Sequence, residues 1–66
     1  MKVYKKITLV GTSSESLEDA IKNAIAKASE TLRGLSWFEV KEIRGSIEGG
    51  KVREYQVVIE VGFVVE

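Results

Sequence analysis

The stretch that decides the fold is residues 36–65, SWFEVKEIRGSIEGGKVREYQVVIEVGFVV. Its second half alternates, and one face of it is apolar without interruption: Tyr55, Val57, Ile59, Val61, Phe63 and Val65. A period of two predicts a half-buried strand over residues 52–65. Gly49-Gly50 suits the positive φ angles of a two-residue hairpin turn, so residues 36–47 are predicted to form the partner strand.

A turn centred on Gly49-Gly50 sets the register that we expect for this hairpin. Phe38 then faces Val61 and Val40 faces Ile59 on the core side, whereas Gln56 faces Ile43. The residues expected on the other face of the sheet are Trp37, Ile43, Ile47, Gln56 and Val58. In a monomer this apolar patch would be exposed to water, so we expect it to be covered, for example by a second copy of the chain.

The segment before this hairpin predicts one strand and one helix. Residues 2–10 alternate imperfectly and are predicted to form a strand. Thr12 and Glu15 have the spacing of a capping box, and Ser13 or Ser14 could also cap the helix that follows. The apolar side chains of residues 14–33 recur at steps of three and four, which predicts a helix: Leu17, Ala20, Ile21, Ala24, Ile25, Ala28 and Leu32. Gly34 is the expected residue after its end.

The element order is therefore β-α-β-β, in the α+β class. A right-handed crossover makes the first two strands run in the same direction, and the hairpin reverses the third. If the most apolar strand, residues 52–65, lies between the others, every pair is antiparallel and the strand order is first-third-second. We expect residues 1–66 to form a single domain with the helix on one face of the sheet.

Composition excludes several kinds of protein. The chain has 66 residues, 10 basic and 10 acidic side chains, and no Cys, His or Pro. The chain therefore lacks the residues that disulfides, ordinary zinc sites and catalysis by His-activated nucleophiles require. Balanced charge argues against binding to nucleic acid or a membrane surface. With no apolar run typical of a signal peptide or a membrane span, we expect a cytoplasmic protein. A chain this small without a disulfide or metal usually needs partners or a ligand for stability, and oligomerisation is the first candidate.

Three side chains are candidates for a binding site, and each has a structural alternative. Trp37 is either a platform for an aromatic ligand or a large side chain that fills an oligomer contact. Gln56 has a donor and an acceptor that suit an imide edge, or it is a polar residue on a wet sheet face. Arg44 could bind a phosphate, or it pairs on the surface with Glu42 or Glu54. These residues form no constellation typical of an enzyme.

The sequence also resembles a known family, the dodecins. The segments that carry the resemblance are Val-Gly-Thr-Ser at 10–13, Ala20-Ile21, Trp37-Phe38-Glu39-Val40, Gly45, Tyr55-Gln56-Val57 and Val61-Gly62-Phe63. Together with the chain length and the β-α-β-β order, they extend the resemblance over nearly the whole chain.

This resemblance implies a hollow homododecamer that binds flavins in stacked pairs between Trp side chains of neighbouring subunits. The expected cofactor is FMN, or riboflavin or FAD, held for storage or sequestration rather than for catalysis, and bacterial members also bind coenzyme A. By analogy Trp37 is the stacking residue, Gln56 binds the polar edge of the isoalloxazine, and Arg44 lies near the FMN phosphate. Val64 departs from the family, because many bacterial members have a basic residue there.

Two other functions compete with flavin storage. One is a structural homo-oligomeric interaction module in which Trp37 is buried without a ligand. The other is a flavin-dependent reductase, which would require a second substrate site. Bound flavin makes a protein yellow, so its visible colour separates the first alternative from flavin storage.

Overall fold

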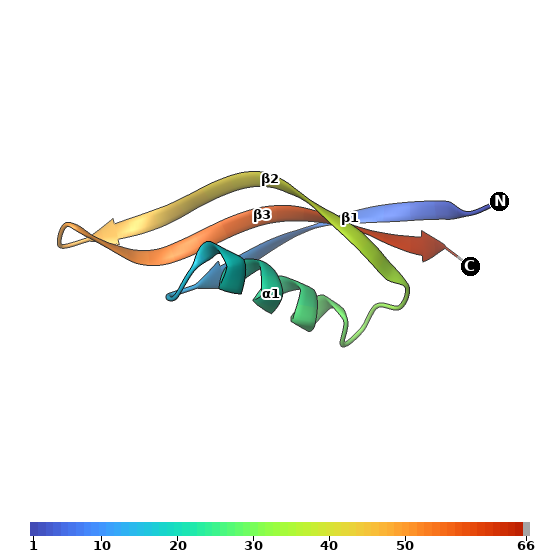
Figure 1. The fold of residues 1–66 in the computed structure, drawn as a ribbon, viewed down its shortest axis with the longest axis horizontal. Helices are drawn as coiled ribbons and strands as arrows, with labels where there is room; N and C mark the ends of the chain where they lie inside the picture. The colour runs from blue at the N-terminus through green and yellow to red at the C-terminus, as the bar shows by residue number, and fades with distance from the viewer. Residues whose placement is uncertain (66) are drawn as a thin grey trace.

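The computed structural model describes residues 1–65. Four elements follow one another along the chain: β1 (Val3–Ser13), α1 (Leu17–Ala28), β2 (Leu35–Glu48) and β3 (Lys51–Val65). The strands form one antiparallel sheet in the order β1-β3-β2, and α1 covers one of its faces (Figure 1). The predicted topology and strand order are therefore confirmed. No helix within residues 1–65 is long and apolar enough to cross a membrane.

The core lies between α1 and the middle of β3. Val57, Ile59 and Val61 are almost completely buried, and they pack against Ala20 and Ala24 of the helix. These residues belong to the apolar face and the alanine-containing stripe that the sequence predicts. The small side chains of the helix allow it to lie close to the sheet.

Gly11 shows how close this approach is. A Cβ atom at this position would collide with the carbonyl oxygen of Ala20 and would lie 2.9 Å from the Cβ of Ala24. Residue 11 therefore has no room for a side chain, because the backbone of α1 occupies that space.

The helix begins later and ends earlier than the predicted range of 14–33. β1 stays paired with β3 as far as Ser13, which keeps residues 12 and 13 extended. The N-cap is Ser16, whose Oγ accepts a hydrogen bond from the backbone N–H of Asp19 at 2.9 Å. The predicted caps at Thr12, Ser13 and Ser14 are thus wrong, although Ser13 Oγ accepts from the N–H of Glu15 at 2.8 Å.

At the other end of the helix, Ser29 is the C-cap and the chain continues in hydrogen-bonded turns. Gly34 has a φ angle of 73°, but it lies just before β2 rather than directly after the helix. The left-handed glycine therefore marks entry into the strand, five residues beyond the helix cap.

The hairpin turn is confirmed, but its register changes along the strands. Gly49 and Gly50 have φ angles of 61° and 77°, as a two-residue turn of this type requires. The predicted pairs Phe38–Val61 and Val40–Ile59 are present. Register shifts then lie between Leu35 and Trp37, between Val40 and Glu42, and between Ser46 and Ile47.

The middle shift overturns part of the predicted register. Lys41 is an extra residue between Val40 and Glu42, so Gln56 pairs with Arg44 and not with Ile43. Ile43 instead pairs with the buried Val57, which places it on the same side of the sheet as α1. A bulge of this kind reverses the facing of every later side chain on its strand.

The second isoleucine of the predicted patch also lies elsewhere. Ile47 and Ile43 line an apolar groove together with Leu17 at the start of α1. This groove lies where the β2–β3 hairpin extends past the N-terminal end of the helix (Figure 1). The predicted grouping of Ile43 and Ile47 with Trp37 and Gln56 was therefore wrong.

Candidate functional site

The sheet face that points away from α1, called the far face below, is organised in cross-strand rows. Each row takes one residue from β1, one from β3 and one from β2, in that order. The rows are Lys6–Gly62–Trp37, Thr8–Glu60–Glu39, Val10–Val58–Glu42 and Thr12–Gln56–Arg44. Trp37, Gln56 and Arg44, the three predicted site residues, thus share one face of the sheet.

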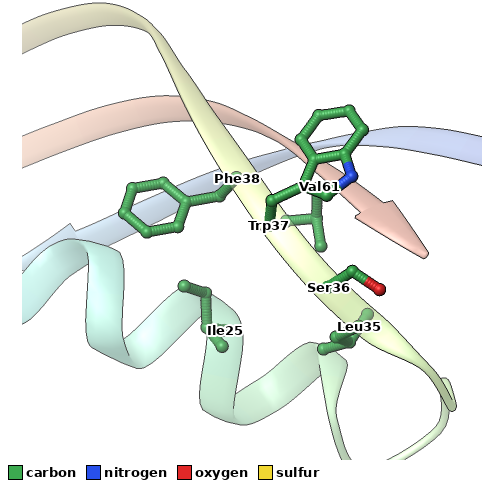
Figure 2. Close-up of a pocket in the computed structure, with 6 residues that line it drawn as sticks. All are labelled: Ile25, Leu35, Ser36, Trp37, Phe38 and Val61. Carbon is green, nitrogen blue, oxygen red and sulfur yellow. The ribbon is translucent and has the colours of Figure 1, made fainter.

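Trp37 lies over the backbone of β3 at Gly62. A Cβ atom on Gly62 would be 2.8 Å from Cδ2 of the indole and still closer to Cε2 and Cζ2. The residue remains 39% exposed, and its indole projects away from α1 (Figure 2). One side of the indole therefore contacts its own chain, while part of the ring system is open to a neighbour or a ligand.

Two side chains of β1 border the indole. The ring of Tyr4 is 6.3 Å from that of Trp37, at an interplanar angle of 56°. The ammonium of Lys6 lies 5.9 Å from the indole centroid, within the range of a cation–π interaction. Trp37, which belongs to β2, is thus bordered by residues of both β1 and β3.

Lys6 also connects this ring to the next row. Its Nζ lies 2.9 Å from a carboxylate oxygen of Glu39 and 2.9 Å from one of Glu60. Hydrogen bonds to Glu60 and Glu39 raise the pKa of Lys6, and the hydrogen bond from Lys6 lowers the pKa of Glu60. Lys6 and Glu60 are therefore both charged at neutral pH.

The cluster of Lys6, Glu39 and Glu60 was not identified from the sequence. The available signal was the alternation of residues 2–10, which places Tyr4, Lys6 and Thr8 on one face of their strand. This alternation alone does not show which residues of β3 lie beside Lys6. That follows only from the β1–β3 register, which pairs Lys6 with Gly62 and Thr8 with Glu60.

Arg44 and Gln56 form a second polar cluster on the far face. Nε of Arg44 donates to Oε1 of Gln56 at 2.8 Å, and Nη1 of Arg44 donates to Glu42 at 2.8 Å. Nε2 of Gln56 donates to Glu54 at 3.0 Å. The guanidinium and the carboxamide are therefore held side by side, and this network also contains the ion pair with Glu42 that was the alternative for Arg44.

The two parts of the predicted site are far apart within one chain. Trp37 pairs with Gly62, which is six residues along β3 from Gln56. At about 3.4 Å per residue, this separation is roughly 20 Å. A planar ring system stacked on Trp37 could therefore not contact Gln56 of the same chain.

A hollow on the other side of β2 is a separate feature. It is lined by Ile25, Leu35, Ser36, Trp37, Phe38 and Val61, and has a volume of about 160 Å³. Figure 2 shows Ile25 and Leu35 below the strand, while the indole lies above it. The hollow is smaller than the roughly 300–1,000 Å³ typical of small-molecule pockets.

Comparison with known proteins identifies the family. The Dodecin family model matches residues 3–66. Dodecin from Thermus thermophilus is 66% identical over 65 residues, which cover 98% of this chain and 94% of that protein. The crystal structure of the Thermus thermophilus protein tt0972 has a TM-score of 0.96 at 65% identity and covers 100% of this chain and 97% of its own. Dodecin from Streptomyces coelicolor also has a TM-score of 0.96, at 45% identity, with 98% of this chain and 93% of its own covered. With this sequence similarity and this fold over almost the whole chain, the protein belongs to the dodecin family.

Proposed function

We propose that this protein stores or sequesters flavin as a homododecamer, with Trp37 stacked on the isoalloxazine ring. Dodecins are small binding proteins rather than enzymes, and the family binds flavins. The choice of FMN or riboflavin, with FAD as a further candidate, is our proposal for this chain.

One observation carries the stacking role of Trp37. The indole lies over Gly62 on the far face and remains 39% exposed. Flat heterocycles stack well on an aromatic side chain that is already held in place, because little conformational entropy is lost on binding. The position of this ring suits an aromatic ligand better than the small hollow beside α1 does.

Homo-oligomerisation is supported by the shape and the surface of the chain. Its extents are 51 × 20 × 13 Å, and it exposes 4897 Å², against about 4,200 Å² for a compact monomer of this mass. Trp37, Phe38, Ile43 and Ile47 are all between 39% and 77% exposed. These residues lie on both faces of the sheet, Trp37 on the far face and the other three on the side of α1, so association of copies would have to cover apolar surface on both faces.

Assembly would also bring the two parts of the site together. In the proposed site, one chain supplies Trp37, and a neighbouring chain supplies Gln56 and Arg44. Gln56 would bind the polar edge of the isoalloxazine, since its carboxamide has both a donor and an acceptor. Arg44 would bind the FMN phosphate. Val64 contributes no charge, so we expect a weaker preference for FMN over riboflavin than two basic residues would give.

The test is direct binding by the assembled protein. Visible absorption of the purified protein and chromatography of the released ligand would identify any bound flavin, and fluorescence quenching would give affinities for riboflavin and FMN. Replacing Trp37 by Ala should weaken binding about 5- to 150-fold, the range expected for one aromatic stack. Trp37→Phe should lose less, because Phe keeps a smaller ring.

Binding and assembly must be measured on the same samples. If the wild-type protein binds no flavin, flavin storage is wrong, and the homo-oligomeric module without a ligand becomes the better explanation. If the Trp37→Ala oligomer falls apart while its chains still quench flavin, Trp37 is an interface residue and not the platform.

Coenzyme A binding and a cytoplasmic location remain predictions from the sequence. Chromatography of ligands released from the same preparation would detect coenzyme A alongside flavin. Fractionation of cells from the source organism would test the location.

A further inference from the structure

We infer that Gly62 is a positioning residue for Trp37: the missing side chain at residue 62 lets the indole lie against β3 in the orientation that a planar ligand can stack on. The part of this inference that concerns the ligand rests on the flavin-binding function proposed above. The part that concerns the ring does not depend on any ligand.

The geometry at this position is restrictive. A Cβ atom on Gly62 would overlap the six-membered ring of the indole, as its distance of 2.8 Å from Cδ2 of Trp37 shows. No real Cβ lies so close to a ring carbon, so either the ring or the strand would have to move. Gly62 lies in the interior of β3, paired with Lys6 on one side and Trp37 on the other. The strand is therefore held on both edges, and the ring is the part that can move.

Glycine at this place is not required by the backbone. The glycines with positive φ angles within residues 1–65 are Gly34, Gly49 and Gly50, so Gly62 has a conformation that other residues adopt easily. Glycine inside a strand lowers stability, because it loses more chain entropy and contributes no packing. The contact with the indole supplies a reason for glycine at this position.

The surroundings of the ring limit where it could go. Tyr4 and Lys6 border the indole on the β1 side, and Lys6 is held by Glu39 and Glu60. A methyl group at residue 62 would push the indole outward or toward these neighbours. Either movement would change the surface that the ligand meets.

The experiment compares Gly62→Ala, Trp37→Ala and the double variant with the wild-type protein. Trp37 is the only Trp in the chain, so its emission and near-ultraviolet circular dichroism report the position of this ring alone. In the ligand-free protein, Gly62→Ala should change both signals. Its affinity for riboflavin should fall about 5- to 150-fold, as when one aromatic stack is lost.

The double variant separates contact with the ring from a general defect of the strand. Gly62→Ala should lower the urea midpoint in the wild-type background but not in the Trp37→Ala background, where no ring is displaced. If Gly62→Ala alone does not assemble, recovery of assembly in the double variant would support the inference in the same way.

Two outcomes would overturn the positioning role. One is a Gly62→Ala protein with wild-type Trp signals and wild-type riboflavin affinity. The other is an equal loss in both backgrounds, in which Gly62→Ala lowers the urea midpoint of Trp37→Ala by as much as it lowers that of the wild-type protein. If the wild-type protein itself binds no flavin, the proposed function fails, but the Trp signals and the urea midpoints still decide whether Gly62 positions the ring.

Discussion

Arg44 donates a hydrogen bond from Nε to Oε1 of Gln56 over 2.8 Å, and the two residues are direct partners across β2 and β3. This contact exists because β2 contains one residue more than β3 at Lys41. Without that bulge, Ile43 would face Gln56 and the guanidinium would lie on the side of α1. A single inserted residue thus creates the polar cluster proposed to bind the flavin edge and phosphate.

The first prediction concerns Arg44. Replacement by Ala should weaken FMN binding more than riboflavin binding, because the lost group is the proposed partner of the phosphate. A hydrogen bond to a charged group contributes about 1.5–3 kcal/mol, or roughly 10- to 150-fold in affinity. Fluorescence titration with both flavins measures the difference. Arg44→Lys should recover only part of it, because an ammonium cannot reproduce the planar guanidinium that also binds Gln56.

Arg53 offers a matched control for this prediction. It is an exposed arginine near the hairpin turn, with Nε 3.6 Å from Glu48. Arg53→Ala should leave the ratio of FMN to riboflavin affinity unchanged. Equal losses of both flavins in Arg44→Ala would instead mean that Arg44 acts on the ring or on the position of Gln56.

The sequence predicted the fold because the strongest patterns are local. The alternation of β3, the small-residue stripe of α1 and Gly49-Gly50 each determine one element or one turn, and only one sheet order then makes every pair antiparallel. The bulge at Lys41 was not predictable in this way. Residues 36–47 show no glycine or break at Lys41, and the shift becomes visible only in the pairing of β2 with β3.

The same reasoning explains which site residues were found. Trp37, Gln56 and Arg44 were selected by residue type and by resemblance, and the structure brings two of them into contact. Lys6 and Glu60 are ordinary charged residues, 54 positions apart in sequence. Only the pairing of β1 with β3 brings them together, so their relation to Trp37 required the structure.

The second prediction concerns the packing of α1 on the sheet. Gly11→Ala should lower the free energy of unfolding by about 1–3 kcal/mol, the usual cost of overpacking, because the added methyl meets the backbone carbonyl of Ala20 and the side chain of Ala24. Urea denaturation at a fixed protein concentration measures this loss. Gly49→Asn is the control, since Asn is accepted at this turn position and a side chain there meets nothing within 4 Å. A Gly11→Ala protein as stable as the control would mean that the helix moves away at little cost.

The third prediction concerns pH. Lys6 lowers the pKa of Glu60, so this carboxylate stabilises the native state above its ordinary pKa, and the contribution is lost as pH falls through the lowered value. Lys6 has a raised pKa, so its contribution is lost only as pH rises through that value. The melting temperature of Glu60→Gln should therefore lie below that of wild type at pH 7, and the difference should shrink on acidification.

A second background tests whether Lys6 is the cause. The Glu60→Gln change is therefore also made in the Lys6→Met protein. If Lys6 is the cause, the difference in melting temperature between Lys6→Met and the double variant should no longer shrink on acidification. Persistence of the same pH dependence would assign it to the other groups that lower the pKa of Glu60, which are the charge of Lys41 and the hydroxyl of Thr8, 3.5 Å from the carboxylate.

The fourth prediction concerns assembly through the apolar groove that contains Ile43 and Ile47. Ile47 is 77% exposed in the single chain, and the groove is lined mainly by apolar side chains, including Leu17 and Val52. If a second copy of the chain covers this groove, Ile47→Lys places a charge in an apolar contact without a partner, which is costly. Sedimentation equilibrium should then show dissociation toward the 7.3 kDa chain, whereas Ile47→Val, which keeps an apolar side chain, should stay assembled.

An Ile47→Lys protein that sediments like wild type would exclude this groove from the contacts between copies. A wild-type protein that stays folded as a 7.3 kDa monomer at micromolar concentration would contradict the homo-oligomer itself.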